Sequence, residues 1–230
     1  MTEVRPATWF GREISARATD YAWAYRLRLT RLGRHPDPAA MLPGHRRPIL
    51  LLPGVYETWH FLEAVGRHLA ALGHPVHTVP GFGHNLGPIS EMAELASRYL
   101  VDADLADVAI VAHSKGGLIG KTMMLTDAGE ARIASMVAIN SPFAGSDYAH
   151  LVPIRTLREF VPTHETIRAL AQSAEVNRRI TSIFSVWDPI IPNGSVLDGA
   201  TNIELPVTGH FRILDRPALL EEVARAVTDS

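Results

Sequence analysis

The sequence predicts an α/β protein with a mainly parallel sheet of about six strands and helices on both faces. Short apolar runs bounded by glycine or proline alternate along the chain with longer segments of helical periodicity. The 230 residues are 47% hydrophobic, enough to bury one sizeable core. Because parallel strands need helical crossovers, the alternation favours a sheet that is covered on both sides.

Six apolar runs are expected to form the strands, and they begin near Arg46, Pro75, Val108, Ile133, Ile180 and Thr201. Apolar residues at helical spacing predict helices over 57–74, 90–104, 116–125 and 216–227. Ser90 is expected to cap the second of these helices, and Pro217 suits the first turn of the last. Only residues 144–179 break the alternation, and they read as one or two helices split by Pro162.

Composition excludes several classes of function. The formal net charge is −2, which argues against nucleic acid as the main partner. With no cysteine, the chain has no disulfide, thiolate nucleophile or Cys-type zinc site. No apolar run is long enough to span a bilayer, and the first residues lack the apolar stretch of a signal peptide, so we expect a cytoplasmic protein. Abundant arginine with scarce lysine is typical of GC-rich bacterial genomes.

Residues 1–46 are expected to form a strap outside the main domain. Residues 1–47 carry a net charge of +5, and apolar residues recur at helical spacing at Ile14, Ala18, Tyr21, Tyr25, Leu29 and Leu32. Arginines lie on the other face, at Arg12, Arg17, Arg26 and Arg31. The favoured reading is a helix that packs its apolar stripe on the domain. The alternative is a basic amphipathic helix that makes peripheral contact with anionic lipid.

Ser114 stands at the seam between the third strand and the helix that follows. The sequence there is Ala112-His113-Ser114-Lys115-Gly116, close to the G-x-S-x-G pattern of a nucleophile elbow. A tight turn of this kind exposes the hydroxyl, and the small residues behind it leave room for the turn. The start of the helix also offers free N–H groups to a developing oxyanion. The bland alternative is an ordinary capping serine.

These motifs resemble the α/β-hydrolases, most closely small bacterial lipases and esterases of the triacylglycerol-lipase type. The resemblance runs from Arg47 to the end of the chain and implies one domain over 47–230. It implies a triad in the chain order Ser, Asp, His. Ser114 would be the nucleophile, His210 in "TGHFRIL" the base, and Asp188 in "VWDPIIP" the acid, with Asp198 in reserve.

The resemblance also implies an oxyanion hole and a substrate pocket. The backbone N–H groups of Lys115 and Val55 would form the hole, although Pro53-Gly54 replaces the usual His-Gly before Val55. Tyr56, His84, Leu151 and Phe160 are the candidate substrate-binding residues. The Lys115 ammonium is expected to reach water along its apolar stem. His113 is expected to support the sheet edge, and the other histidines are expected at the surface.

Residues 144–179 would form a small cap over the site in such a fold. No phosphate loop, dinucleotide fingerprint or histidine-rich metal spacing occurs, so we expect chemistry without a cofactor or a metal. The leading hypothesis is a serine hydrolase that cleaves small-molecule or lipid esters with an apolar acyl part. Two alternatives stay open: an acyltransferase with the same triad, and a non-catalytic lipid- or partner-binding protein of the same fold.

Overall fold

A parallel sheet forms the centre of the molecule. The computed structural model describes residues 7–30, 37–151 and 155–228, and their side chains except at 7–14, 151 and 155. The six strands lie in the order β2-β1-β3-β4-β5-β6, all parallel. They are β1 (Ile49–Leu52), β2 (Val76–Thr78), β3 (Val108–His113), β4 (Ile133–Ile139), β5 (Ile180–Trp187) and β6 (Thr201–Thr208). The prediction of six parallel strands is confirmed.

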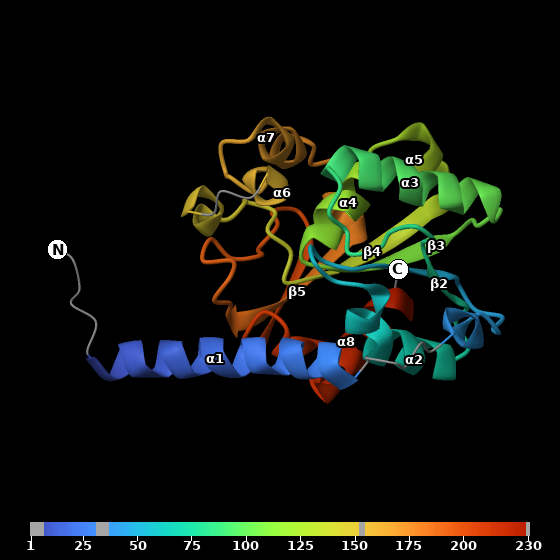
Figure 1. Cartoon of the computed structure of the whole chain (residues 1–230). Helices are drawn as coiled ribbons and strands as arrows, with labels where there is room; N and C mark the ends of the chain where they lie inside the picture. The colour runs from blue at the N-terminus through green and yellow to red at the C-terminus, as the bar shows by residue number, and fades with distance from the viewer. Residues whose placement is uncertain (1–6, 31–36, 152–154, 229–230) are drawn as a thin grey trace.

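Helices cover both faces of this sheet (Figure 1). On one face lie α3 (Ile89–Asp102), α4 (Lys115–Met124) and α5 (Asp127–Arg132). On the other lie α1 (Ala7–Thr30), α2 (Glu63–Ala71) and α8 (Pro217–Thr228). Short 3₁₀ helices join these elements: η1 (Pro38–Met41), η2 (Trp59–Leu62), η3 (Asp147–Leu151), η4 (Asn177–Arg179) and η5 (Arg212–Asp215). Within the described ranges, no helix has the length and apolar character needed to cross a bilayer.

The core divides into two clusters, one on each face of the sheet. Side chains alternate along a strand, so Leu50 and Leu52 of β1 pack toward α3 and α4, whereas Ile49 and Leu51 pack toward α2 and α8. The β1 and β3 strands are buried along their whole length, as expected for strands covered on both faces. This rigid centre fixes the ends of the strands, where the polar residues gather.

Helix α1 packs on the side of α2 and α8, but through a different face from the one that the sequence favoured. The residues that turn toward the body are Asp20, Trp23, Ala24 and Leu27. The expected stripe is instead largely exposed, with 55% of Tyr21, 64% of Tyr25 and 48% of Leu29 accessible. The side chain of Ile14 and all of Leu32 lie outside the described residues. The lipid-binding alternative stays a prediction.

The segment expected to form a cap contains η3, α6 (Arg155–Arg158), α7 (Glu165–Gln172) and η4, with Pro162 between the two α-helices. Phe160 of this segment, together with Ile167 and Leu170, belongs to the core cluster on the α3 and α4 side. Ser90 does not cap α3, which begins at Ile89. The carboxylate of Glu159 accepts the free N–H of Ile89 at 3.0 Å instead. The cap segment therefore closes the N-terminus of a helix on the main body.

Candidate active site

Ser114 occupies a strained turn between β3 and α4. Its backbone has φ 53° and ψ −121°, a conformation that L residues rarely adopt. Its N–H donates to the carbonyl of Ile139 at 2.9 Å, which ties the turn to the next strand. A Cβ atom on Gly116 would collide with the backbone of Leu52, and one on Gly117 would collide with the Ser141 side chain. The glycines therefore allow the tight turn that carries the serine.

His210 and Asp188 form a buried pair at the carboxyl edge of the sheet. Nδ1 of His210 donates to Oδ2 of Asp188 at 2.6 Å, and both side chains are under 7% exposed. The other carboxylate oxygen of Asp188 accepts the backbone N–H groups of Ile190 and Ile191, at 2.8 and 3.1 Å. The carboxylate is thus fixed on both oxygens. Its bond to Nδ1–H leaves the lone pair of the imidazole on Nε2.

Electrostatics favour a charged form of this pair. Burial by itself raises the pKa of Asp188, but the nearby His210, its hydrogen bond and the two backbone N–H donors outweigh burial and lower it. Burial by itself lowers the pKa of His210, but the Asp188 carboxylate outweighs burial and raises it, helped by Glu57 and Asp20. His210 is therefore a stronger base than a histidine in water.

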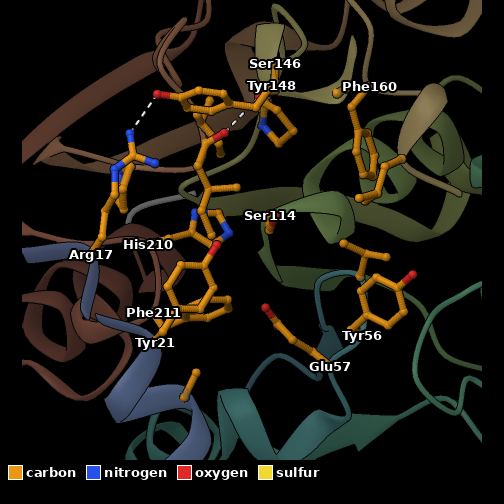
Figure 2. Close-up of a pocket in the computed structure, with 18 of the residues that line it drawn as sticks. Arg17, Tyr21, Tyr56, Glu57, Ser114, Ser146, Tyr148, Phe160, His210 and Phe211 are labelled. Atoms are coloured by element: carbon orange, nitrogen blue, oxygen red, sulfur yellow. Dashed lines mark hydrogen bonds between the residues drawn. The ribbon is translucent and has the colours of Figure 1, made fainter. Parts of the chain in front are cut away.

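Ser114 and His210 face the same cavity, which has a volume of about 890 Å³ (Figure 2). Within the described residues, hydrogen bonds join His210 to Asp188 and to Asp20, but none joins it to the Ser114 hydroxyl. Asp188 is not itself in the cavity wall and lies behind His210. Bonds between a nucleophile and its base are often long in an empty site and tighten when substrate binds.

Two backbone N–H groups, those of Lys115 and Val55, are the candidates for an oxyanion hole. Lys115 is the first residue of α4, so its N–H has no acceptor within the helix. Val55 lines the cavity in the loop after β1. The Glu57 carboxylate accepts the N–H of Gly54 at 2.8 Å, and the Asn85 amide donates to the carbonyl of Pro53 at 2.7 Å. These two bonds hold the loop that carries Val55.

The Lys115 side chain is buried rather than extended to water, which corrects the expectation. Its Nζ donates to the carbonyl of Asn85 at 3.1 Å and to the carbonyl of Gly87. Burial lowers the pKa of Lys115 to about 8, while the Glu159 carboxylate opposes that shift. The ammonium therefore fastens the 85–87 turn to the start of α4.

His113 and Glu57 form a second buried pair, which the sequence analysis did not include in the site. Nδ1 of His113 lies 2.8 Å from Oε1 of Glu57, and Nε2 lies 3.1 Å from the carbonyl oxygen of His210. Both ring nitrogens of His113 therefore face oxygen atoms, one on a side chain and one on the backbone. This pair joins the loop of Gly54 to the loop of His210.

The same pair raises the question of a metal. Ligand atoms of Glu57, His113 and His210 lie within 4.8 Å of one another. However, hydrogen bonds already engage both ring nitrogens of His113, and Nδ1 of His210 is engaged with Asp188. The donor set fits a hydrogen-bond network better than it fits a cation.

His74 was expected at the surface, but it is buried, with Nδ1 2.9 Å from the carbonyl oxygen of Arg47.

The loop that carries His210 is also held from the sheet. The Asn140 amide donates to the carbonyls of Gly209 and His210, at 3.3 and 3.1 Å, and its oxygen accepts the N–H of Ser185. Asn140 follows β4 and Ser185 lies in β5, so the ends of two strands grip one loop. No local sequence signal marks Asn140, since its partners lie 45 and 70 residues away.

The cavity walls agree only partly with the expected substrate-binding residues. Tyr56 and Phe160 line the cavity, as does Leu157 from the cap segment. His84 does not: it is exposed, and the side chain that turns inward from this loop is Asn85. The side chain of Leu151 lies outside the described residues.

A further wall of the cavity comes from α1, which the sequence analysis had not placed in the site. Its contribution is Arg17, Ala18, Tyr21, Ala22, Ala24, Tyr25 and Arg28. Arg17 donates to the Tyr148 hydroxyl of η3 at 2.7 Å (Figure 2), and Arg28 donates to the carbonyl of Tyr56 at 2.7 Å. The exposed tyrosines of α1 therefore border an open cavity, which explains why their apolar stripe was mistaken for a packing face.

Comparison with known proteins establishes the fold. No protein-family model matches the chain, and no curated protein sequence matches it. Solved structures do match. Lipase BlEst2 of Bacillus licheniformis, in its mature form, is 14% identical with a TM-score of 0.62, over 84% of this chain and 94% of that one. A hydrolase from Oleispira antarctica is 15% identical with a TM-score of 0.62, over 82% and 93%.

Lipase B of Aspergillus fumigatus is 19% identical with a TM-score of 0.66, over 80% of this chain and 52% of that one. At such identities the likeness concerns the fold alone. This chain has the α/β-hydrolase fold, and that prediction is confirmed.

Proposed function

We propose that this protein of α/β-hydrolase fold is a serine hydrolase that cleaves carboxylic esters with an apolar acyl part. The observation that carries the proposal is the strained turn at Ser114, which shares a cavity with the base of a buried His210–Asp188 pair. A serine hydroxyl is a poor nucleophile at neutral pH unless a base is positioned beside it. A strained serine that lines the same cavity as such a base supports acyl transfer as the reaction class.

The first half of the reaction forms an acyl-enzyme. Oγ of Ser114 attacks the ester carbonyl carbon as Nε2 of His210 takes the hydroxyl proton. Asp188 stabilises the imidazolium that forms. The carbonyl oxygen becomes an oxyanion and accepts the N–H groups of Val55 and Lys115. The C–O bond to the alcohol then breaks, and the imidazolium gives its proton to the leaving oxygen.

The second half releases the acid. His210 takes a proton from a water molecule, whose oxygen attacks the acyl carbon on Ser114. The same oxyanion site stabilises the second tetrahedral intermediate. Its collapse breaks the bond to Oγ, and the imidazolium returns the proton to Ser114. The ester and one water molecule are the only reactants that the two halves consume, and the side chains return to their starting state.

The cavity walls favour an ester whose acyl part and alcohol part are both apolar. The leaving alcohol must lie on the side of His210, which protonates it. In Figure 2 that side holds Tyr21 and Phe211, while Tyr56 and Phe160 lie on the other side of Ser114. The acyl chain therefore runs between the loop after β1 and the cap segment, and the alcohol lies against α1. Aromatic and aliphatic walls of this kind bind by removing apolar surface from water.

The test is hydrolysis of p-nitrophenyl esters of increasing acyl length by the wild type and by Ser114→Ala. The variant is expected to lose at least 10³-fold in kcat while its melting temperature is kept. Ser173→Ala removes an exposed hydroxyl at the end of α7 and is expected to keep full activity. Hydrolysis by Ser114→Ala at the wild-type rate would refute the assignment. Products trapped by added alcohols or amines, in place of the free acid, would indicate the acyltransferase alternative.

A further inference from the structure

The acidic residue of α1 that turns toward the body is bound to the loop of the proposed base. Asp20 is completely buried. Its Oδ2 accepts the backbone N–H of His210 at 2.9 Å, and its Oδ1 accepts those of Phe211 and Arg212, at 2.9 and 3.0 Å. One carboxylate thus receives three consecutive backbone donors. About 190 residues of sequence separate it from them.

The backbone of this loop is shaped to bind the Asp20 carboxylate. A buried carboxylate is costly unless hydrogen bonds compensate for the lost water, and three N–H donors do so here. The loop also fits closely around it. Gly209 has φ +116°, and a Cβ atom at that position would collide with Oδ1 of Asp20. The backbone before His210 therefore has the shape that the carboxylate requires.

We propose that Asp20 is a positioning residue for His210, which makes α1 a working part of the active site rather than a cover on the domain. The inference rests on the proposed function. Asn140 and His113 hold the loop by its carbonyl oxygens, from the ends of strands β4 and β3. Asp20 holds the N–H side of the same loop. With both sides held, the His210 ring stays aimed between Asp188 and the cavity.

The charge of Asp20 also acts on the imidazole. Among the described residues, the carboxylates that act on His210 are Asp188, Glu57 and Asp20. The His113 ring lies 4.7 Å away between centroids, and Tyr21 of α1 lines the same cavity. The three carboxylates all raise the pKa of His210, and Asp188 has the largest effect of the three. Loss of the Asp20 charge therefore lowers this pKa. Because His210 must be neutral to act as a base, the acid limb of the activity profile then moves to lower pH.

The experiment compares Asp20→Asn with Trp23→Phe. The asparagine amide would place an N–H against one of the three backbone N–H groups, which disturbs the loop without a change of volume. Trp23→Phe removes a different bond of the same helix, from the indole Nε1 to Asp215 of η5 at 2.8 Å, and keeps Asp20 with its three backbone donors. For Asp20→Asn we expect kcat to fall 10- to 100-fold, KM to stay within about threefold, and the acid limb to move to lower pH.

Trp23→Phe is expected to keep the wild-type kcat and the wild-type pH profile, with at most a lower melting temperature. Equal losses in both variants, or a lower kcat for Asp20→Asn with an unmoved acid limb, would show that Asp20 only helps to fasten α1. Unchanged kcat in a folded Asp20→Asn variant would overturn the inference outright.

A measurement on the wild type keeps the inference testable if Asp20→Asn does not fold or if the proposed function fails. Amide hydrogen exchange at His210, Phe211 and Arg212 requires no activity. Three N–H groups held by a buried carboxylate should exchange as slowly as the core strands. Fast exchange of these amides in the folded protein would contradict the inference. Slow exchange in a protein that hydrolyses no ester would refute only the proposed function.

Discussion

Gly116→Ala should damage catalysis far more than stability. A Cβ atom on Gly116 would lie 2.8 Å from the carbonyl carbon of Leu52 and 3.1 Å from the oxygen of Pro53, with the oxygen of Leu52 closer still. Ordinary contacts of this kind are about 3.5–4 Å long. All three atoms belong to the backbone that leads to Val55, so the loop must retreat by roughly 1 Å to relieve the contact.

The size of the effect follows from that displacement. Overpacking of a close contact costs about 1–3 kcal/mol, and the better helix propensity of alanine returns about 1 kcal/mol. The net loss of stability should then be about 0–2 kcal/mol. The N–H of Val55, which we propose as an oxyanion donor, would however move out of hydrogen-bond range of the oxyanion. Loss of one such donor lowers kcat by about 10²- to 10³-fold.

Gly120→Ala is the matched control, one turn further along α4. There the closest neighbour is Sδ of Met136, the flexible part of a side chain, and the next atoms lie at 3.4 and 3.5 Å. We expect kcat/KM within threefold of the wild type. The assay is ester hydrolysis with active-site titration, alongside thermal unfolding. Full kcat in Gly116→Ala, or an equal loss in Gly120→Ala, would refute the assignment of the loop after β1 to the oxyanion hole.

The remaining predictions concern pH. Because the pKa of His210 is raised, wild-type kcat/KM should rise with pH through a value above 6.5, and Asp188→Asn should lower both that value and kcat, the latter by about 10³- to 10⁴-fold. If Asp188→Asn left the pH dependence of kcat/KM unchanged, the result would contradict the proposed role of the His210–Asp188 pair. Burial lowers the pKa of both Lys115 and Lys121 to about 8. The unfolded chain therefore binds more protons than the folded chain between pH 8 and 10.5, so the free energy of unfolding contributed by these lysines should rise with pH over that range. In urea titrations Lys115→Met should remove about half of the rise, and an unchanged rise would show that Lys115 is solvated.

The sheet could be predicted because its signals are local. Each strand is a short apolar run with a glycine, proline or polar stop, and the period of side chains decides its faces. The elbow at Ser114 is local too, since strand, serine and glycines are contiguous. The sequence analysis did not predict the short helix α5, because its six residues, which include Gly129, show little helical periodicity of apolar side chains. Its N-cap, Thr126, accepts the N–H of Gly129 and is the one signal that favoured a helix.

The failures share a different cause, which is that their partners lie far along the chain. The carbonyls that hold the Lys115 ammonium come from a turn about 30 residues earlier, so a lysine that reaches water was the natural prediction. The sequence analysis assigned no role to Asp20. Its three donors follow β6. Tyr21 and Tyr25 looked like core residues because an apolar wall of a cavity has the same pattern as a packed face.

The most direct test of the account is the site at which a fluorophosphonate reacts with the folded wild-type protein. This reagent phosphonylates an activated serine and releases fluoride, so peptide mass spectrometry identifies the residue that carries the adduct. We predict one adduct on Ser114 and a large loss of labelling rate in Asp188→Asn. A folded protein that stays unlabelled, or that carries the adduct on another residue, would contradict the claim that these side chains form one catalytic unit.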